Sequence, residues 1–95
     1  MTAPIETIRL RIAGQVQGVG YRLWATRTAA SLGLRGWVRN RRDGSVEALV
    51  TGVPEAVATM IAAARKGPIG ARVTDVIVTP DKDDGSSGFA ARPTE

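Results

Sequence analysis

The chain has 95 residues, of which 43% are hydrophobic, 4% are aromatic and 23% are charged. This length predicts one domain over residues 1–95, with enough apolar side chains for one modest core. Cysteine and histidine are both absent, which excludes disulfides, thiolate or imidazole metal ligands, a cysteine nucleophile and an imidazole general base.

Basic residues outnumber acidic residues by 13 to 9, so the formal net charge is +4, and eleven of the basic residues are arginine. The guanidinium fork matches phosphate and carboxylate geometry, which favours an anionic ligand. The same excess of basic residues is also typical of proteins that bind nucleic acid. No apolar run approaches the ~18–20 residues of a membrane span, and Glu6, Arg9 and Arg11 fall where a signal peptide would be apolar. We therefore expect a cytoplasmic protein without membrane contact.

The first half of the chain predicts a strand, a glycine-rich loop and a helix. Apolar residues alternate with polar or small ones over residues 8–13, the period of a strand with one buried face. Three glycines follow within residues 14–20. The next apolar residues recur at helical spacing and end just before Gly33, where a C-terminal cap is expected; they are Tyr21, Ala25, Ala29 and Leu32.

A hairpin and a second helix come next. Asp43-Gly44 separates two strand patterns, residues 34–40 and 46–51, and such a dipeptide is a strong hairpin signal. Pro54 suits the first turn of a helix, which the dipeptide Gly67-Pro68 ends. The apolar stripe of this helix is Val57, Met60, Ile61 and Ala64.

The last third predicts a fourth strand over residues 73–80, a polar and mobile loop over residues 81–88, a short closing strand from Phe89 and a tail over residues 93–95. The resulting β-α-β-β-α-β order is that of the ferredoxin-like sandwich, an α+β fold with an antiparallel sheet and two helices on one face. Strands one and three are then central, with strand two beside strand three. Because this fold hosts many unrelated functions, function has to be argued from individual residues.

The loop over residues 14–20 leads into a helix N-terminus, where consecutive backbone N–H groups can form an anion-binding nest. It does not match a dinucleotide fingerprint, which would need glycine in place of Leu23. It does not match a Walker A loop either, which would need lysine in place of Gly20. Arg22 lies in the first helical turn, where a cation opposes the helix dipole by ~0.3–1 kcal/mol, and a bound anion would offset that cost. A plain tight connection with a solvated arginine explains the same residues.

Two other features have structural interpretations. Asn40 closes the second strand, and asparagine is common in turns. The acidic segment 81–85 lacks the ligand spacing of a calcium loop, so we expect no metal.

Two longer motifs resemble the signatures of the acylphosphatase family. Residues 14–22 (GQVQGVGYR) resemble the first signature, and residues 36–47 (GWVRNRRDGSVE) resemble the second. The agreement extends through Gly67-Pro68 and residues 71–73 to Phe89. The chain departs from the family pattern at three places. It has Gln15 where the family commonly has a basic residue and Tyr21 where Phe is commoner, and its closing strand is less apolar at Ala90-Ala91.

The resemblance implies the fold described above and the hydrolysis of a small-molecule acyl phosphate by water, which yields a carboxylate and inorganic phosphate without a cofactor. It implies that Asn40 orients the attacking water and that Arg22 holds the phosphate. The backbone N–H groups that share this task are those of the phosphate-binding loop: Gln17, Gly18, Val19, Gly20, Tyr21 and Arg22. We expect a monomer.

This chemistry does not require histidine. A carboxylate leaves readily because the pKa of its acid is about 4–5, so no general acid is needed, and phosphoryl transfer depends mainly on positioning and charge stabilisation. Two alternatives stay open, a non-catalytic acylphosphatase-like binding module and a basic RNA-binding domain. RNA-binding domains of this fold stack bases on aromatic residues of the central strands, where this chain has Arg9, Arg11, Glu47 and Leu49. We therefore expect no nucleic-acid partner.

Overall fold

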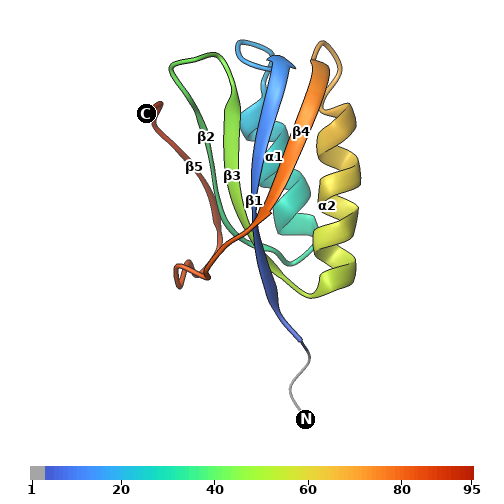
Figure 1. The fold of residues 1–95 in the computed structure, drawn as a ribbon, viewed down its shortest axis with the longest axis vertical. Helices are drawn as coiled ribbons and strands as arrows, with labels where there is room; N and C mark the ends of the chain where they lie inside the picture. Colours follow the sequence, from blue (N-terminus) through green and yellow to red (C-terminus); the bar gives the residue numbers. More distant parts are fainter. Residues whose placement is uncertain (1–3) are drawn as a thin grey trace.

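The computed structural model describes residues 4–95, so the first three residues of the expected domain lie outside the described range. Each predicted helix and strand is present, and they follow one another in the predicted order (Figure 1). In chain order the elements are β1 (Glu6–Gln15), α1 (Tyr21–Ser31), β2 (Arg35–Asn40), β3 (Val46–Gly52), α2 (Pro54–Lys66), β4 (Arg72–Pro80) and β5 (Phe89–Arg92). None of the helices in this part of the chain has the length and apolar character needed to cross a membrane.

The strands form one sheet in the order β4-β1-β3-β2-β5, with β1 and β3 at its centre as predicted. Neighbouring strands among the four long ones are antiparallel, whereas β5 pairs with β2 in parallel, so the complete sheet is mixed. The direction of β5 follows from the path of the chain. After β4 the chain crosses one end of the sheet to the opposite edge, and the strand that starts there must run in the direction of β2 (Figure 1).

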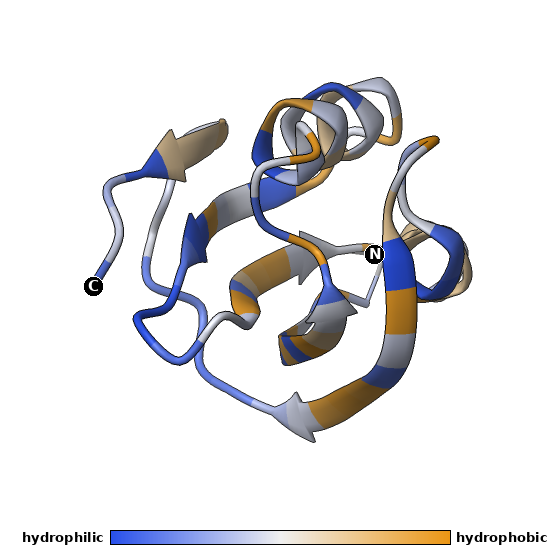
Figure 2. Ribbon diagram, turned by 90° about the horizontal axis from the view of Figure 1, so that it is seen from above, coloured by the Kyte–Doolittle hydropathy of each residue, from blue (hydrophilic) through white to orange (hydrophobic). Residues whose placement is uncertain are grey.

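Both helices cover the same face of the sheet (Figure 1). Hydrophobic and hydrophilic residues alternate along the strands (Figure 2), which directs one set of side chains toward the helices. The predicted helical stripes are buried, except that Leu32 and Ile61 are only partly buried. The largest fully buried apolar side chains of this core are Leu10, Ile12, Met60, Val16 and Val38.

The open face of the sheet carries charged side chains and Trp37. All seven residues of β3 are buried, although two of them, Glu47 and Thr51, are polar. The Glu47 side chain is only 6% exposed because Arg9 and Arg39 pair with it at 2.6 and 2.8 Å. The Arg39 guanidinium also lies over the ring of Trp37, 4.6 Å from its centroid. Trp37 therefore packs on the sheet.

The segment 81–88 has neither helix nor strand and lies against β2. Asp83 pairs with Arg35 at 2.6 Å, and the indole N–H of Trp37 donates a hydrogen bond of 3.1 Å to Asp84. These contacts hold the segment against the sheet where the chain crosses from the edge at β4 to the edge at β5.

Candidate active site

The loop between β1 and α1 leaves a row of backbone donors without protein partners. Gly18 and Gly20 have φ values of 74° and 79°, a left-handed conformation that glycine adopts without strain. The first backbone hydrogen bond of α1 runs from Trp24 N–H to the Gly20 carbonyl at 3.0 Å. Within residues 4–95, no backbone N–H from Gln17 to Leu23 donates to another protein group. The loop therefore presents the donors that an anion-binding nest requires.

No side chain among residues 4–95 accepts a hydrogen bond at this helix cap either. Gly20 is the N-terminal cap of α1 and has no side chain to accept from them, and the first turn contains no acidic residue. Uncapped N–H groups and the helix dipole together make this end of α1 electropositive.

Arg22 adds a positive charge at the same place. Its guanidinium donates a long hydrogen bond of 3.4 Å to the Arg92 carbonyl. Six arginines form ion pairs with carboxylates: Arg9, Arg11, Arg35, Arg39, Arg41 and Arg92. The other five form none with residues 4–95, and Arg22 is the only one of these five that is half-buried rather than exposed. Its location thus leaves a partly desolvated cation available to a ligand.

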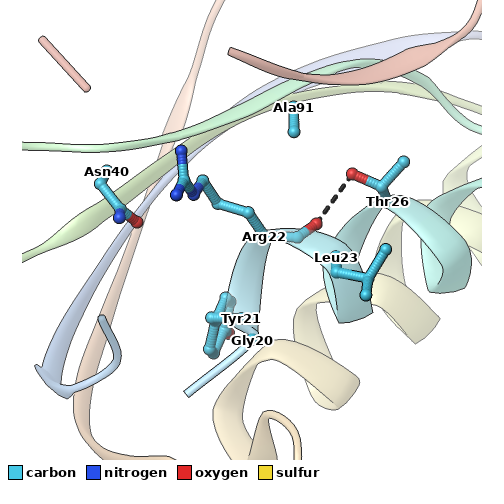
Figure 3. A pocket seen from close by; sticks show the side chains of 7 residues that line it. All are labelled: Gly20, Tyr21, Arg22, Leu23, Thr26, Asn40 and Ala91. Atoms are coloured by element: carbon cyan, nitrogen blue, oxygen red, sulfur yellow. Dashed lines mark hydrogen bonds between the residues drawn. The ribbon is translucent and has the colours of Figure 1, made fainter. Parts of the chain in front are cut away.

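Asn40 reaches the same pocket from β2. Val38 is buried under the helices, and Asn40, two residues further along the strand, faces the same side of the sheet. Figure 3 shows the Arg22 guanidinium extending toward the Asn40 side chain. The pocket has a volume of about 350 Å³ and is lined by Gly20, Tyr21, Arg22, Leu23, Thr26, Asn40 and Ala91. The fold therefore brings Arg22 and Asn40 together, which residue spacing alone did not establish.

Only part of the predicted phosphate-binding loop lines this pocket. Gly20, Tyr21 and Arg22 do so, whereas Gln17, Gly18 and Val19 do not.

Gln17 has a further role that sequence reasoning missed. Its side-chain amide donates hydrogen bonds to the carbonyls of Arg41 and Ser45, at 2.7 and 2.9 Å. It therefore ties the phosphate-binding loop to the β2–β3 turn, directly beside Asn40. Both acceptors are backbone atoms, which every residue has, so no pattern in the sequence marks this contact.

The Tyr21 side chain is directed away from the reacting groups. Its hydroxyl is buried and donates a hydrogen bond of 2.7 Å to the Ala64 carbonyl in α2. Burial raises the pKa of Tyr21 well above its usual value of 10.0, so the phenol stays neutral. Tyr21 therefore lines the pocket, while its hydroxyl contributes to packing between the helices.

No group of three or more acidic side chains among residues 4–95 is arranged to hold a metal ion. The polar groups that meet at this pocket are thus a guanidinium, a side-chain amide, the Thr26 hydroxyl and backbone N–H groups.

Comparison with known proteins points to one family. The sequence model of the acylphosphatase family matches residues 8–91. An acylphosphatase of Rhodospirillum rubrum is 51% identical over 90 residues, which are 95% of this chain and 99% of the relative. The crystal structure of acylphosphatase from Bacillus subtilis is 34% identical, with a TM-score of 0.88 over 94% of this chain and 99% of that one. The structure of an acylphosphatase from Coxiella burnetii is 30% identical, with a TM-score of 0.89 over 93% of both chains. With its fold, its two motifs and nearly its whole length matched, this chain belongs to the acylphosphatase family.

Proposed function

We propose that this enzyme of the acylphosphatase family hydrolyses acyl phosphates by in-line attack of water, with Arg22 and the loop N–H groups holding the phosphate and Asn40 orienting the water. The observation that carries the proposal is the row of unpartnered N–H groups from Gln17 to Leu23, beside a half-buried guanidinium that has no carboxylate partner within residues 4–95. Such a site favours an anion with several acceptor oxygens.

Phosphate binding is the first step of the proposed reaction. The Arg22 guanidinium donates to phosphate oxygens through its planar fork, and the loop N–H groups donate to the others. These donors are fixed before the substrate arrives, so they stabilise the charge on the equatorial oxygens in the transition state without reorganising.

Water attack is the second step. The Asn40 amide holds a water molecule opposite the leaving carboxylate, and the water oxygen forms a bond to phosphorus. The bond between phosphorus and the acyl oxygen breaks, and its electron pair leaves with the carboxylate. A dianionic acyl phosphate and water thereby give a carboxylate and dihydrogen phosphate, which retains both protons of the water.

Hydrolysis of benzoyl phosphate, followed by its absorbance, tests the two roles. We expect Arg22→Ala to lower kcat about 100-fold or more and to abolish competitive inhibition by inorganic phosphate. We expect Asn40→Ala to lower kcat by a similar factor while the inhibition constant of phosphate changes less than about twofold, because the amide binds the water.

Arg27→Ala is the matched control, since Arg27 is an exposed arginine of the same helix that forms no ion pair with residues 4–95. Equal loss of phosphate binding in the Arg22 and Asn40 variants would contradict the assigned roles. Folded wild-type protein without turnover would instead indicate a phosphate-binding module.

We also propose that the enzyme acts as a monomer, because Arg22 and Asn40, the two side chains assigned to the reaction, meet within one chain. Sedimentation equilibrium over a range of protein concentrations measures the mass directly. A specific activity that rises with concentration, together with a dimer mass, would overturn this proposal.

A further inference from the structure

We propose that basic residues around the pocket, but outside it, attract acyl phosphates electrostatically and so increase the rate at which these dianions reach Arg22. This inference rests on the proposed function, because it takes the substrate to be an anion that binds at Arg22. It assigns a function to basic side chains that take no part in holding the phosphate or the water.

Successive helices and strands run in opposite directions, so the connections between them lie at two ends of the molecule (Figure 1). One end has the β1–α1 loop, the β2–β3 turn, the α2–β4 loop and the tail after β5. Arg22 lies in the first helical turn after the β1–α1 loop, and Asn40 is the last residue before the β2–β3 turn. The pocket therefore lies at this end, which we call the pocket end.

The two ends differ in the sign of their charge. The pocket end, residues 14–22, 40–46, 63–73 and 93–95, carries two acidic residues and six basic ones, which are Arg22, Arg41, Arg42, Arg65, Lys66 and Arg72. The opposite end, residues 4–7, 31–36, 51–56 and 79–88, carries five acidic residues and two basic ones. An anion in solution is therefore attracted to the pocket end rather than to the opposite end.

Most of the positive charges at the pocket end are not neutralised by carboxylates. Arg41 is the only one of the six basic residues that forms an ion pair with residues 4–95, at 3.5 Å from Glu47. The four outside the pocket that form none within this range are all exposed; they are Arg42, Arg65, Lys66 and Arg72. Because these side chains face water without a partner, their field extends to a ligand in solution.

The helix dipoles leave this field positive. The pocket end contains the start of α1 and the end of α2, so the positive end of one dipole lies near the negative end of the other. Arg65 and Lys66 lie in the last turn of α2, where they more than offset the charge of about −0.5 at that helix end. The uncapped start of α1 thus keeps its positive potential.

The charges are close enough to the pocket to act on the substrate. The two shorter dimensions of the molecule are only 23 and 22 Å. At a separation of roughly 10–15 Å in water, one positive charge raises the local concentration of a dianion about two- to threefold. The screening length is about 30 Å at 0.01 M salt and about 3 Å at 1 M, so this attraction depends on ionic strength.

Hydrolysis of benzoyl phosphate at about 0.01 M and about 1 M salt tests the proposal. In Arg72→Glu and in Arg42→Glu we expect kcat/KM at the lower salt concentration to fall about fivefold, because each variant reverses one charge. We expect kcat to stay within about twofold of the wild-type value, since the field acts on the bound substrate and on the transition state alike. At the higher salt concentration we expect both variants to have the kcat/KM of the wild type.

Lys82→Glu is the matched control. Lys82 is exposed and forms no ion pair with residues 4–95, as is the case for Arg72. The two residues lie at opposite ends of β4, a strand of nine residues that spans about 30 Å. We therefore expect Lys82→Glu to change kcat/KM less than about twofold at either salt concentration.

The possible results separate this proposal from the proposed function. Equal kcat/KM in the three variants, or a loss in Arg72→Glu and Arg42→Glu that persists at about 1 M salt, would overturn electrostatic attraction and leave the proposed function intact. A loss of kcat in these two variants would also overturn it, because the residues would then act in the reaction itself. Wild-type protein that does not hydrolyse benzoyl phosphate at either salt concentration would overturn the proposed function.

Discussion

At the scale of single residues, arginine has two distinct uses in this protein. Six arginines pair with carboxylates, among them Arg9 and Arg39, which enclose the buried Glu47 on the open face of the sheet. Arg22 has the same side chain but lies at an uncapped helix N-terminus without a carboxylate partner in residues 4–95. Composition predicts an anionic ligand in general terms, whereas the structure leaves five guanidiniums without ion pairs in residues 4–95 and half-buries one of them, that of Arg22.

Gln17 gives a prediction at this scale. Gln17→Ala removes both hydrogen bonds from the loop to the β2–β3 turn and leaves the carbonyls of Arg41 and Ser45 without these donors. We expect the free energy of unfolding to fall by about 1–3 kcal/mol and kcat to fall more than the affinity for phosphate, because Asn40 loses its fixed position relative to the loop. Urea unfolding and benzoyl phosphate kinetics measure the two effects.

Gln15→Ala serves as the control for this prediction, since Gln15 is an exposed glutamine two residues earlier. A Gln17→Ala variant with wild-type stability and wild-type kcat would show that the contact neither holds the loop nor positions Asn40.

At the scale of elements, the start of α1 is packed against the end of α2. The Tyr21 hydroxyl bonds to Ala64, whose carbonyl is one of the last four of α2 and has no partner within the helix. Gly67 follows at φ 68°, and a Cβ placed there would lie 2.8 Å from the Tyr21 ring. Tyr21, which directly precedes Arg22, is therefore held in place by contacts with the end of α2.

Tyr21→Phe tests this link between the helices. The variant keeps the ring but leaves the Ala64 carbonyl without its donor, so we expect a loss of about 1–2 kcal/mol in the free energy of unfolding. We expect kcat to change less than about twofold, because the hydroxyl is directed away from the reacting groups. A large loss of kcat at unchanged stability would place the hydroxyl in the reaction.

Most of the fold is predictable from the sequence, for an identifiable reason. The alternation in β1, the helical spacing in α1 and the Asp43-Gly44 turn each depend on local backbone geometry, and the structure confirms all three elements. The burial of both faces of β3 was not predictable, because a buried Glu47 requires arginines from two other strands. The meeting of Arg22 with Asn40 likewise depends on strand order rather than on spacing.

At the scale of the whole molecule, acidic side chains stabilise the fold only when they are ionised. Burial favours the neutral form of Glu47, but hydrogen bonds from Arg9 and Arg39 outweigh this and hold its pKa below the usual 4.5. The pKa values of Asp81 and Asp83 are also lowered, mainly by hydrogen bonds from Arg9 and Arg35 respectively. A carboxyl group whose pKa is lower in the folded protein than in the unfolded chain stabilises the fold at pH values above its unfolded-state pKa. This stabilisation is lost as the pH falls through the folded-state pKa.

We therefore expect the free energy of unfolding to be nearly constant from pH 5 to 8, since the chain has no histidine, and to fall below about pH 4. In Glu47→Gln we expect a lower plateau, by about 1–3 kcal/mol, and a shallower fall in acid, because one of the contributing carboxylates is gone. Urea unfolding at a series of pH values measures both. If the free energy of unfolding of Glu47→Gln fell in acid as steeply as that of the wild type, Glu47 would not contribute to the loss of stability at low pH.

The missing cap of α1 connects ligand binding to the stability of the whole domain. If a phosphate binds the N–H groups that residues 4–95 leave without partners, the anion acts as the helix cap, supplied from solution rather than by a side chain. Binding free energy then adds to the free energy of unfolding by mass action, about 2.7 kcal/mol at a phosphate concentration one hundred times Kd. We expect inorganic phosphate to raise the Tm of the wild type and leave that of Arg22→Ala unchanged. The enzyme would then be least stable when it is empty and would gain its most stable first helix only while it holds substrate or product.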